Sequence, residues 1–154
     1  MFGLSSNHAT TGTATVVIEQ SVDKVFNFVA VDFYQNYPRW SPEVLELEQL
    51  SAPPPKINSL YRQVRIDQGQ RSESTFKITT WTADQKLVFE GVSNPYRCSY
   101  DFAATAASAN TRLTFTFELT RLELFMLPFE KLIRIAVQEG AARTVKNLKK
   151  LIES

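Results

Sequence analysis

Cysteine and histidine are almost absent from this sequence, and their scarcity excludes several kinds of site. The one cysteine, Cys98, permits neither an internal disulfide nor a thiolate-rich metal site. The one histidine, His8, lies in a polar N-terminal stretch, so the rest of the chain cannot supply a Ser–His or Cys–His pair. A zinc or iron centre built on histidines is excluded in the same way. We therefore expect no metal, no cofactor and no residue that can be assigned as catalytic.

An excess of one charge and a long apolar run are also missing. With 17 Lys and Arg against 16 Asp and Glu, the formal net charge of +1 gives no field that attracts nucleic acid. The most apolar stretch, 122–137, is too short and too charged to span a bilayer. Residues 1–12 contain no basic segment followed by an apolar run, so we expect a cytoplasmic protein without a secretion signal. The five glycines form no phosphate-binding loop.

The chain of 154 residues is long enough for one domain with its own core. Residues 1–12 are small and polar and predict a mobile tail, and residues 13–154 predict a single domain. Thr13 to Gln20 is rich in β-branched residues and predicts a first strand. Nothing in the sequence fixes an oligomeric state.

Two short helices are predicted after this strand. Ser21 is a candidate cap for the first, in which apolar residues recur at helical spacing at Val22, Val25, Phe26 and Val29. The second, around Asp32 to Tyr37, is expected to stop near Pro38, because a residue before proline is disfavoured in a helix.

From Val44 onward the period of the pattern changes from helical to two. Turn residues recur at Pro53-Pro54-Pro55, Gly69, Ala83-Asp84, Asn94-Pro95 and Ser108-Ala109-Asn110. Five such turns separate six candidate strands, which predicts an antiparallel meander. The last strand alternates most clearly, with Leu113, Phe115, Phe117 and Leu119 on one face.

A long helix is predicted at the C-terminal end. Pro128 suits a first helical residue, and an apolar stripe follows at Ile133, Val137, Ala141, Val145, Leu148 and Ile152. A sheet with one apolar face must cover that face, and a curved sheet cannot touch a long helix everywhere. Small residues in the middle of the helix, Ala136 and Gly140 among them, therefore predict a cavity. The alternative is an aromatic ring packed tightly against Gly140.

The order of these elements carries a family resemblance. The segments SVDKVFNFVA and DFYQNYPRWSPEVLELEQL resemble the opening of the START-like (SRPBCC) superfamily, also called the polyketide cyclase/dehydrase and lipid-transport group. The ending, TRLTFTFEL and then a helix closing with VKNLKKLIES, is also similar, so the resemblance spans about Thr13 to Ser154. It implies an α+β helix-grip fold, with about seven strands wrapped around the C-terminal helix and a hydrophobic pocket between them. It implies no shared catalytic set, because members range from ligand carriers to cyclases.

Candidate ligand contacts follow from the predicted faces of the strands and the helix. The sheet contributes Phe76, Ile78, Phe89, Tyr96, Tyr100, Phe115 and Phe117, and the helical segment contributes Phe129, Ile133, Ala136 and Gly140. Any one of these residues, taken alone, is also typical of a protein core. Together, tyrosine hydroxyls among phenyl rings favour an amphipathic ligand over a dry core.

Arg62 is the most informative charge, because it is in phase with Leu60, Val64 and Ile66. If that face points inward, Arg62 would bind an acidic or carbonyl head group, since a buried guanidinium must be paired. The alternative is an edge or bulged strand on which Arg62 reaches solvent.

Five other residues are given structural roles. Glu43, Glu46 and Glu48 are spaced for an exposed face, and Trp40 is expected to pack under the short helices or at the mouth of the sheet. Trp81 is expected on the outer face or near a strand end.

Three functions remain open at this point. The first is binding or transport of a small apolar or amphipathic molecule in the cavity. The second is a metal-free cyclase or dehydratase, which would need an inward-facing carboxylate or other acid–base group. The third is a protein-interaction or membrane-facing module that uses the apolar segment 122–129, whose alternative role is core or cavity lid.

Overall fold

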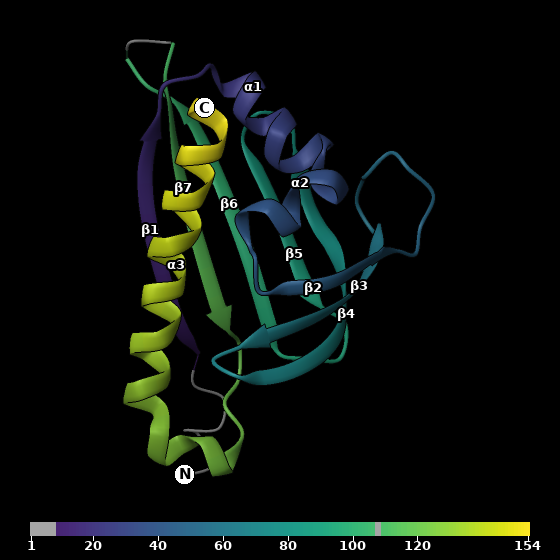
Figure 1. The fold of residues 1–154 in the computed structure, drawn as a ribbon, viewed down its shortest axis with the longest axis vertical. Helices are drawn as coiled ribbons and strands as arrows, with labels where there is room; N and C mark the ends of the chain where they lie inside the picture. Colours follow the sequence, from purple (N-terminus) through teal and green to yellow (C-terminus); the bar gives the residue numbers. More distant parts are fainter. Residues whose placement is uncertain (1–8, 107–108) are drawn as a thin grey trace.

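The backbone of the computed structural model, which describes residues 9–106 and 109–154, forms one curved antiparallel sheet with its helices gathered on one face (Figure 1). The strands are β1 (Thr10–Ile18), β2 (Val44–Gln49), β3 (Leu60–Asp67), β4 (Gln70–Thr82), β5 (Lys86–Gly91), β6 (Tyr96–Ala104) and β7 (Thr111–Leu119). The helical elements are α1 (Val22–Phe26), the π-helical turn η2 (Asn27–Val31), α2 (Phe33–Trp40), the 3-10 helix η3 (Leu124–Phe129) and α3 (Glu130–Glu153). The seven strands follow the order β1-β7-β6-β5-β4-β3-β2.

This architecture confirms the predicted helix-grip fold. The six strands from β2 to β7 form a meander in which each strand pairs with the next, and β1 closes the sheet beside β7. The first strand begins at Thr10 rather than Thr13, because 10–12 pair with β7. Residues 1–8 of the predicted tail, His8 included, lie outside the described residues.

Helix α3 runs along β1 and β7 (Figure 1). Its side chains form hydrogen bonds with backbone groups of the edge strand β1. The side-chain amide of Gln138 donates to the carbonyl of Thr13 at 2.8 Å and accepts from its N–H at 3.0 Å. The ammonium of Lys149 donates to the carbonyl of Val17 at 2.6 Å. An open edge can pair with another chain, so these contacts protect β1 as well as dock the helix.

The helix boundaries differ from the prediction at two prolines. Helix α2 continues through Pro38 to Trp40, where the N–H of Ser41 donates to the carbonyl of Tyr37 and the Trp40 side chain is buried. Burial of this last turn outweighs the weak preference of the residue before a proline for a non-helical conformation. Pro128 lies inside η3, and α3 begins only at Glu130. Ser21 precedes α1 as predicted, but its side chain makes no capping hydrogen bond.

An aromatic core fills the space between α2 and the middle strands. Phe33 is 1% exposed and lies at its centre. Its ring contacts five others at centroid distances from 4.8 to 6.1 Å: Tyr37, Trp40, Tyr61, Phe76 and Phe89. Trp40 is thereby confirmed as a structural residue packed with the short helices.

Trp81 lies near the end of β4, one of the two predicted positions, but a bulge in β4 places it on the inner face rather than the outer one. The register of β4 against β5 shifts between Ile78 and Thr80, so the alternation of faces changes after Ile78. Trp81 therefore pairs with the buried Leu87 and meets Phe26 edge to face at 5.3 Å.

Candidate functional site

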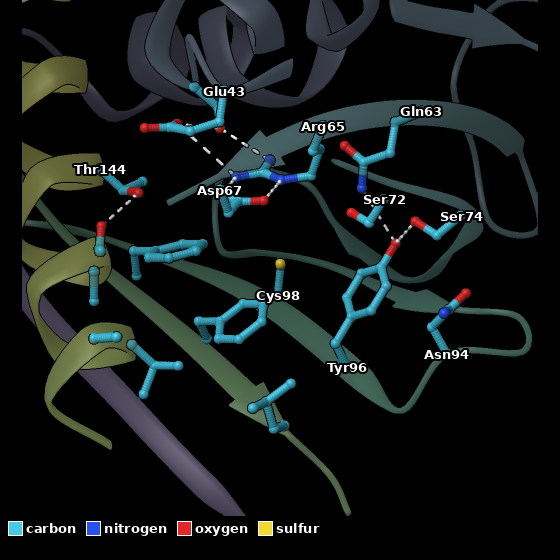
Figure 2. A pocket seen from close by; sticks show the side chains of 18 of the residues that line it. Glu43, Gln63, Arg65, Asp67, Ser72, Ser74, Asn94, Tyr96, Cys98 and Thr144 are labelled. Atoms are coloured by element: carbon cyan, nitrogen blue, oxygen red, sulfur yellow. Dashed lines mark hydrogen bonds and ion pairs between the residues drawn. The ribbon is translucent and has the colours of Figure 1, made fainter. Parts of the chain in front are cut away.

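A cavity of about 650 Å³ lies between the sheet and α3 and is partly open to solvent (Figure 2). Its walls come mainly from β3, β6, β7 and the middle of α3. Half of the predicted ligand contacts line it: Tyr96, Tyr100, Phe115, Phe117, Ala136 and Gly140. A Cβ placed on Gly140 would meet only the Arg143 guanidinium, at 3.7 Å, so no aromatic ring packs on this glycine.

The other apolar candidates are not among the described residues that line the cavity. Phe76, Ile78 and Phe89 are at most 1% exposed and belong to the aromatic core, because α2 covers this part of the sheet. Phe129 is 56% exposed on η3, and Ile133 is half-buried near the start of α3. For Phe76, Ile78 and Phe89, periodicity identified the inward face correctly but could not show how far along the strands the cavity extends.

The prediction that Arg62 faces the cavity is wrong. Arg62 lies on the outer face of β3, where its guanidinium pairs with Glu46 at 3.2 Å, Glu48 at 2.9 Å and Glu73 at 3.3 Å. Val64, which suggested an inward face, is buried on this outer side and is not part of the core cluster. Because β3 carries apolar residues on both faces, the sequence pattern did not show which face of this strand points inward.

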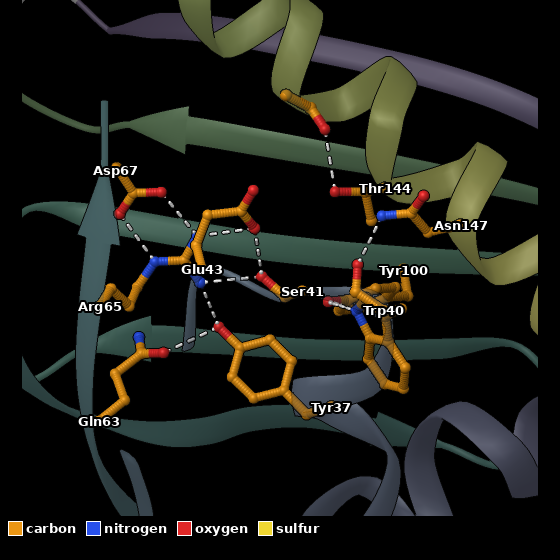
Figure 3. A network of polar contacts seen from close by, with 11 residues as sticks. Tyr37, Trp40, Ser41, Glu43, Gln63, Arg65, Asp67, Tyr100, Thr144 and Asn147 are labelled. Atoms are coloured by element: carbon orange, nitrogen blue, oxygen red, sulfur yellow. Dashed lines mark hydrogen bonds and ion pairs between the residues drawn. The ribbon is translucent and has the colours of Figure 1, made fainter. Parts of the chain in front are cut away.

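The inner face of β3 instead carries Arg65, which sequence reasoning missed. Its Nε and Nη2 atoms donate to the two carboxylate oxygens of Asp67 at 3.0 and 2.9 Å. Its Nη1 atom donates to the hydroxyls of Tyr37 at 3.0 Å and Ser41 at 3.1 Å (Figure 3). The arginine is therefore a fixed cation in the polar part of the cavity wall. The available signal was its phase with Tyr61 and Gln63, the aromatic and polar side of the strand.

Glu43 also lines the cavity, which corrects its predicted exposed role. A register shift in β2 between Val44 and Glu46 separates it from the alternation of Glu46 and Glu48, which stay on the outer side. The Glu43 carboxylate accepts from the Ser41 hydroxyl at 3.3 Å and lies 3.9 Å from Arg65 Nη2. The cavity therefore contains an inward carboxylate.

A chain of hydrogen bonds continues from Arg65 along the cavity wall (Figures 2 and 3). The Tyr37 hydroxyl donates to Gln63 Oε1 at 2.9 Å, and Gln63 Nε2 donates to the Tyr96 hydroxyl at 3.2 Å. Tyr96 in turn shares a hydrogen bond with the Ser74 hydroxyl at 2.9 Å. These bonds satisfy polar groups that would be costly to bury alone.

Burial raises the pKa of the thiol and phenol groups that line the cavity, so they keep their protons well above neutral pH. It raises the pKa of the Cys98 thiol to about 12, although the nearby positive charge of Arg65 opposes the shift. Burial likewise raises the pKa of Tyr100 well above its ordinary value, and that of Tyr96 as well. A neutral thiol is a poor nucleophile, so Cys98 is a packing residue here.

We expect alkaline pH to reveal the buried thiol in the free energy of unfolding. The folded protein holds the Cys98 proton up to about pH 12, whereas an unfolded chain releases it near about 8.5. Ionisation in that window favours the unfolded state, so stability falls as pH rises, by at most about 1.4 kcal/mol for each pH unit. Urea unfolding at pH 8 and pH 10 should show a larger loss for the wild type than for Cys98→Ala. Equal losses would show that Cys98 does not contribute.

The apolar segment 122–129 is divided between the interior and the surface. Leu122 is fully buried, and Met126 lines the cavity, whereas Leu124 is 69% exposed and Phe125 75% exposed. The described residues contain no group of three or more His, Cys, Asp or Glu that could hold a metal ion. None of the helices in the described part of the chain is long and apolar enough to cross a membrane.

Sequence comparison assigns a chain with this helix-grip fold to a known family. The family profile described as polyketide cyclase / dehydrase and lipid transport matches residues 9–153. The chain belongs to this family, and thus to the START-like superfamily that it resembles. Among curated protein sequences, none matches it at a significant level.

Solved structures share the fold at low sequence identity. A START superfamily protein from Mycobacterium smegmatis is 15% identical with a TM-score of 0.73, covering 94% of this chain and 97% of that one. An aromatase/cyclase from a Streptomyces species is 14% identical with a TM-score of 0.75, covering 95% and 94%. Norcoclaurine synthase from Thalictrum flavum is 12% identical with a TM-score of 0.74, covering 96% and 95%.

Proposed function

We propose that this protein binds a small amphipathic molecule in the cavity between α3 and the sheet. The observation that carries the proposal is the cavity itself, whose volume of about 650 Å³ lies in the usual range for small-molecule sites. Phe115 and Phe117 supply apolar wall, while Arg65 and Glu43 supply a polar end. The family described above includes both lipid transport and cyclisation, so such a ligand suits either activity.

The orientation of the ligand follows from this division of the wall. Its apolar body would lie against the phenyl rings of β7 and the small residues of α3, where burial from water is favourable. Its polar group would lie near Arg65, Ser41 and Glu43, because a polar atom buried without a partner costs free energy.

Filling the cavity should abolish binding without unfolding the protein. A side chain at Gly140 enters open space, so Gly140→Phe is expected to weaken binding of the neutral fluorescent probe N-phenyl-1-naphthylamine at least about tenfold. Fluorescence titration measures the affinity, and thermal unfolding checks the fold. Ala142→Phe, on the exposed side of the same helix, is the matched control and should bind like the wild type.

The proposal fails if the wild type binds no such probe and native mass spectrometry finds no small molecule with protein purified from cells. It also fails if Gly140→Phe, still folded, binds the probe as tightly as Ala142→Phe.

A second candidate, cyclase or dehydratase activity, is favoured by one observation: the Glu43 carboxylate faces the cavity. A carboxylate there can remove a proton from a carbon between two carbonyl groups, and the nearby positive charge of Arg65 offsets the negative charge that forms on the substrate. We expect a short poly-β-ketone to cyclise faster with the wild type than with Glu43→Gln. Equal rates for the two proteins, measured by chromatography of the products, would remove this candidate.

A further inference from the structure

The donors at the polar end of the cavity are already engaged by the protein. A guanidinium has five N–H groups. Four of those on Arg65 are hydrogen-bonded, two to Asp67, one to Tyr37 and one to Ser41. The fifth, on Nη2, has the Glu43 carboxylate 3.9 Å away. Asp67 therefore occupies the paired N–H groups with which an arginine normally binds a carboxylate of a ligand.

The neighbouring hydroxyl and amide donors are engaged as well. The Ser41 hydroxyl donates to Glu43, the Tyr37 hydroxyl donates to Gln63, and the Gln63 amide donates to Tyr96. Each bond is directed away from Arg65, because the guanidinium donates to both hydroxyl oxygens. A ligand acceptor placed here would have to break one of these bonds.

Unused acceptor capacity, in contrast, is present on Glu43. Its Oε1 atom accepts from Ser41, while its Oε2 atom has no hydrogen-bond partner among the described residues. A carboxylate offers about four lone-pair sites, so it can take a further donor. Glu43 is half-buried, and Figure 3 shows its carboxylate between Ser41 and Arg65.

We propose that Glu43 selects a ligand whose buried polar group is a neutral hydrogen-bond donor, a hydroxyl, and that it discriminates against a carboxylate at this end of the cavity. This inference rests on the proposed function. A ligand carboxylate would meet the like charge of Glu43, because the one N–H group of Arg65 without a hydrogen bond among the described residues lies on the side of that same carboxylate. A ligand ammonium would lie beside the guanidinium of Arg65. A hydroxyl donates to Glu43 and brings no net charge into the cavity.

The test compares three ligands of one skeleton by displacement of N-phenyl-1-naphthylamine at pH 7: naphthalene, 2-naphthol and 2-naphthoate. We expect the wild type to bind 2-naphthol about fivefold or more tighter than naphthalene, as one hydrogen bond allows, and 2-naphthoate most weakly. Glu43→Leu, similar in size but without an acceptor, should bind 2-naphthol and naphthalene equally. Glu43→Gln, which keeps an amide oxygen, should retain part of the preference.

Two controls separate this effect from other causes. Glu48→Leu removes a carboxylate from the outer face of β2, the strand that follows Glu43, and should leave the preference unchanged. Arg143, exposed beside the cavity, is the alternative anchor for an acid, so any binding of 2-naphthoate should fall in Arg143→Gln.

The inference is overturned if 2-naphthoate binds as tightly as 2-naphthol, or if Glu43→Leu keeps the preference for 2-naphthol. If neither the probe nor any of the three ligands binds, the proposed function fails and this inference fails with it. Binding of naphthalene alone refutes only the head-group inference.

Discussion

Replacement of Phe33 by alanine is expected to lower the free energy of unfolding by about 3–5 kcal/mol, the usual cost of removing a buried phenyl ring. Phe33 joins α2 to the sheet, and its ring lies 5.2 Å from Tyr61 and 5.5 Å from Phe89, centroid to centroid. Since rigid aromatic rings surround it, the space left behind can collapse only in part. Urea unfolding followed by tryptophan fluorescence measures the loss.

The matched control is Phe125→Ala on η3. Phe125 is 75% exposed, so its removal should change the free energy of unfolding by no more than about 0.5 kcal/mol. A loss at Phe125 comparable with that at Phe33 would show that the exposed apolar segment is covered in solution. A loss of less than about 1 kcal/mol at Phe33 would contradict the described core.

The same substitution at two glycines should have opposite effects. A Cβ on Gly12 of β1 would collide with the backbone carbonyl of Val137 in α3, which cannot rotate away as a side chain can. We expect Gly12→Ala to force α3 off the sheet and to lower stability by about 1–3 kcal/mol. Gly140→Ala enters open space within α3 and should raise stability by about 0.5–1 kcal/mol, because alanine favours the helix.

Thermal and urea unfolding of both glycine variants provide the measurement, and each variant serves as the control for the other. A neutral Gly12→Ala would mean that α3 does not pack as closely on β1 as described. Probe binding adds a second readout, since a displaced α3 would also change the shape of the cavity, whereas Gly140→Ala should keep most of its volume.

The architecture was predictable because its signals are local. Turn residues such as Gly69 and Asn94-Pro95 separate the strands, and the predicted alternation of Leu113, Phe115 and Phe117 is observed in β7. The long helix is marked by its own period, which differs from that of the strands. These features depend on neighbouring residues, so one sequence suffices to recognise them.

The polar end of the site was not predictable, because it depends on a backbone irregularity in β2, and a second irregularity, in β4, similarly reverses the face of a core residue. The register shift in β2 turns Glu43 inward, and the one in β4 turns Trp81 inward, and neither carries a distinctive residue. Arg62 and Arg65 occupy one strand and differ only in face, so an error of one residue exchanges the surface arginine for the cavity arginine.

The sequence predicted which face of the sheet lines the cavity, but not how far along the strands the cavity extends. Tyr96, Tyr100 and Phe115 line the cavity, while Phe76 and Phe89 point from the same side of the sheet into solid core. The two groups differ because α2 lies over Phe76 and Phe89, where the ring of Phe33 fills the space between helix and sheet. That position is a tertiary contact between distant segments, which periodicity does not encode.

The pairing of β1 with β7 also sets a condition on how the chain reaches its folded state. Thr10 lies opposite Leu119, so the first strand has no neighbour until almost the whole chain has been synthesised. Because closing such a long loop costs entropy before any contact forms, this step should be slow compared with formation of the β2 to β7 meander. Until β7 is synthesised β1 stays unpaired, and α3, which follows β7 in the chain, is not yet present to cover it.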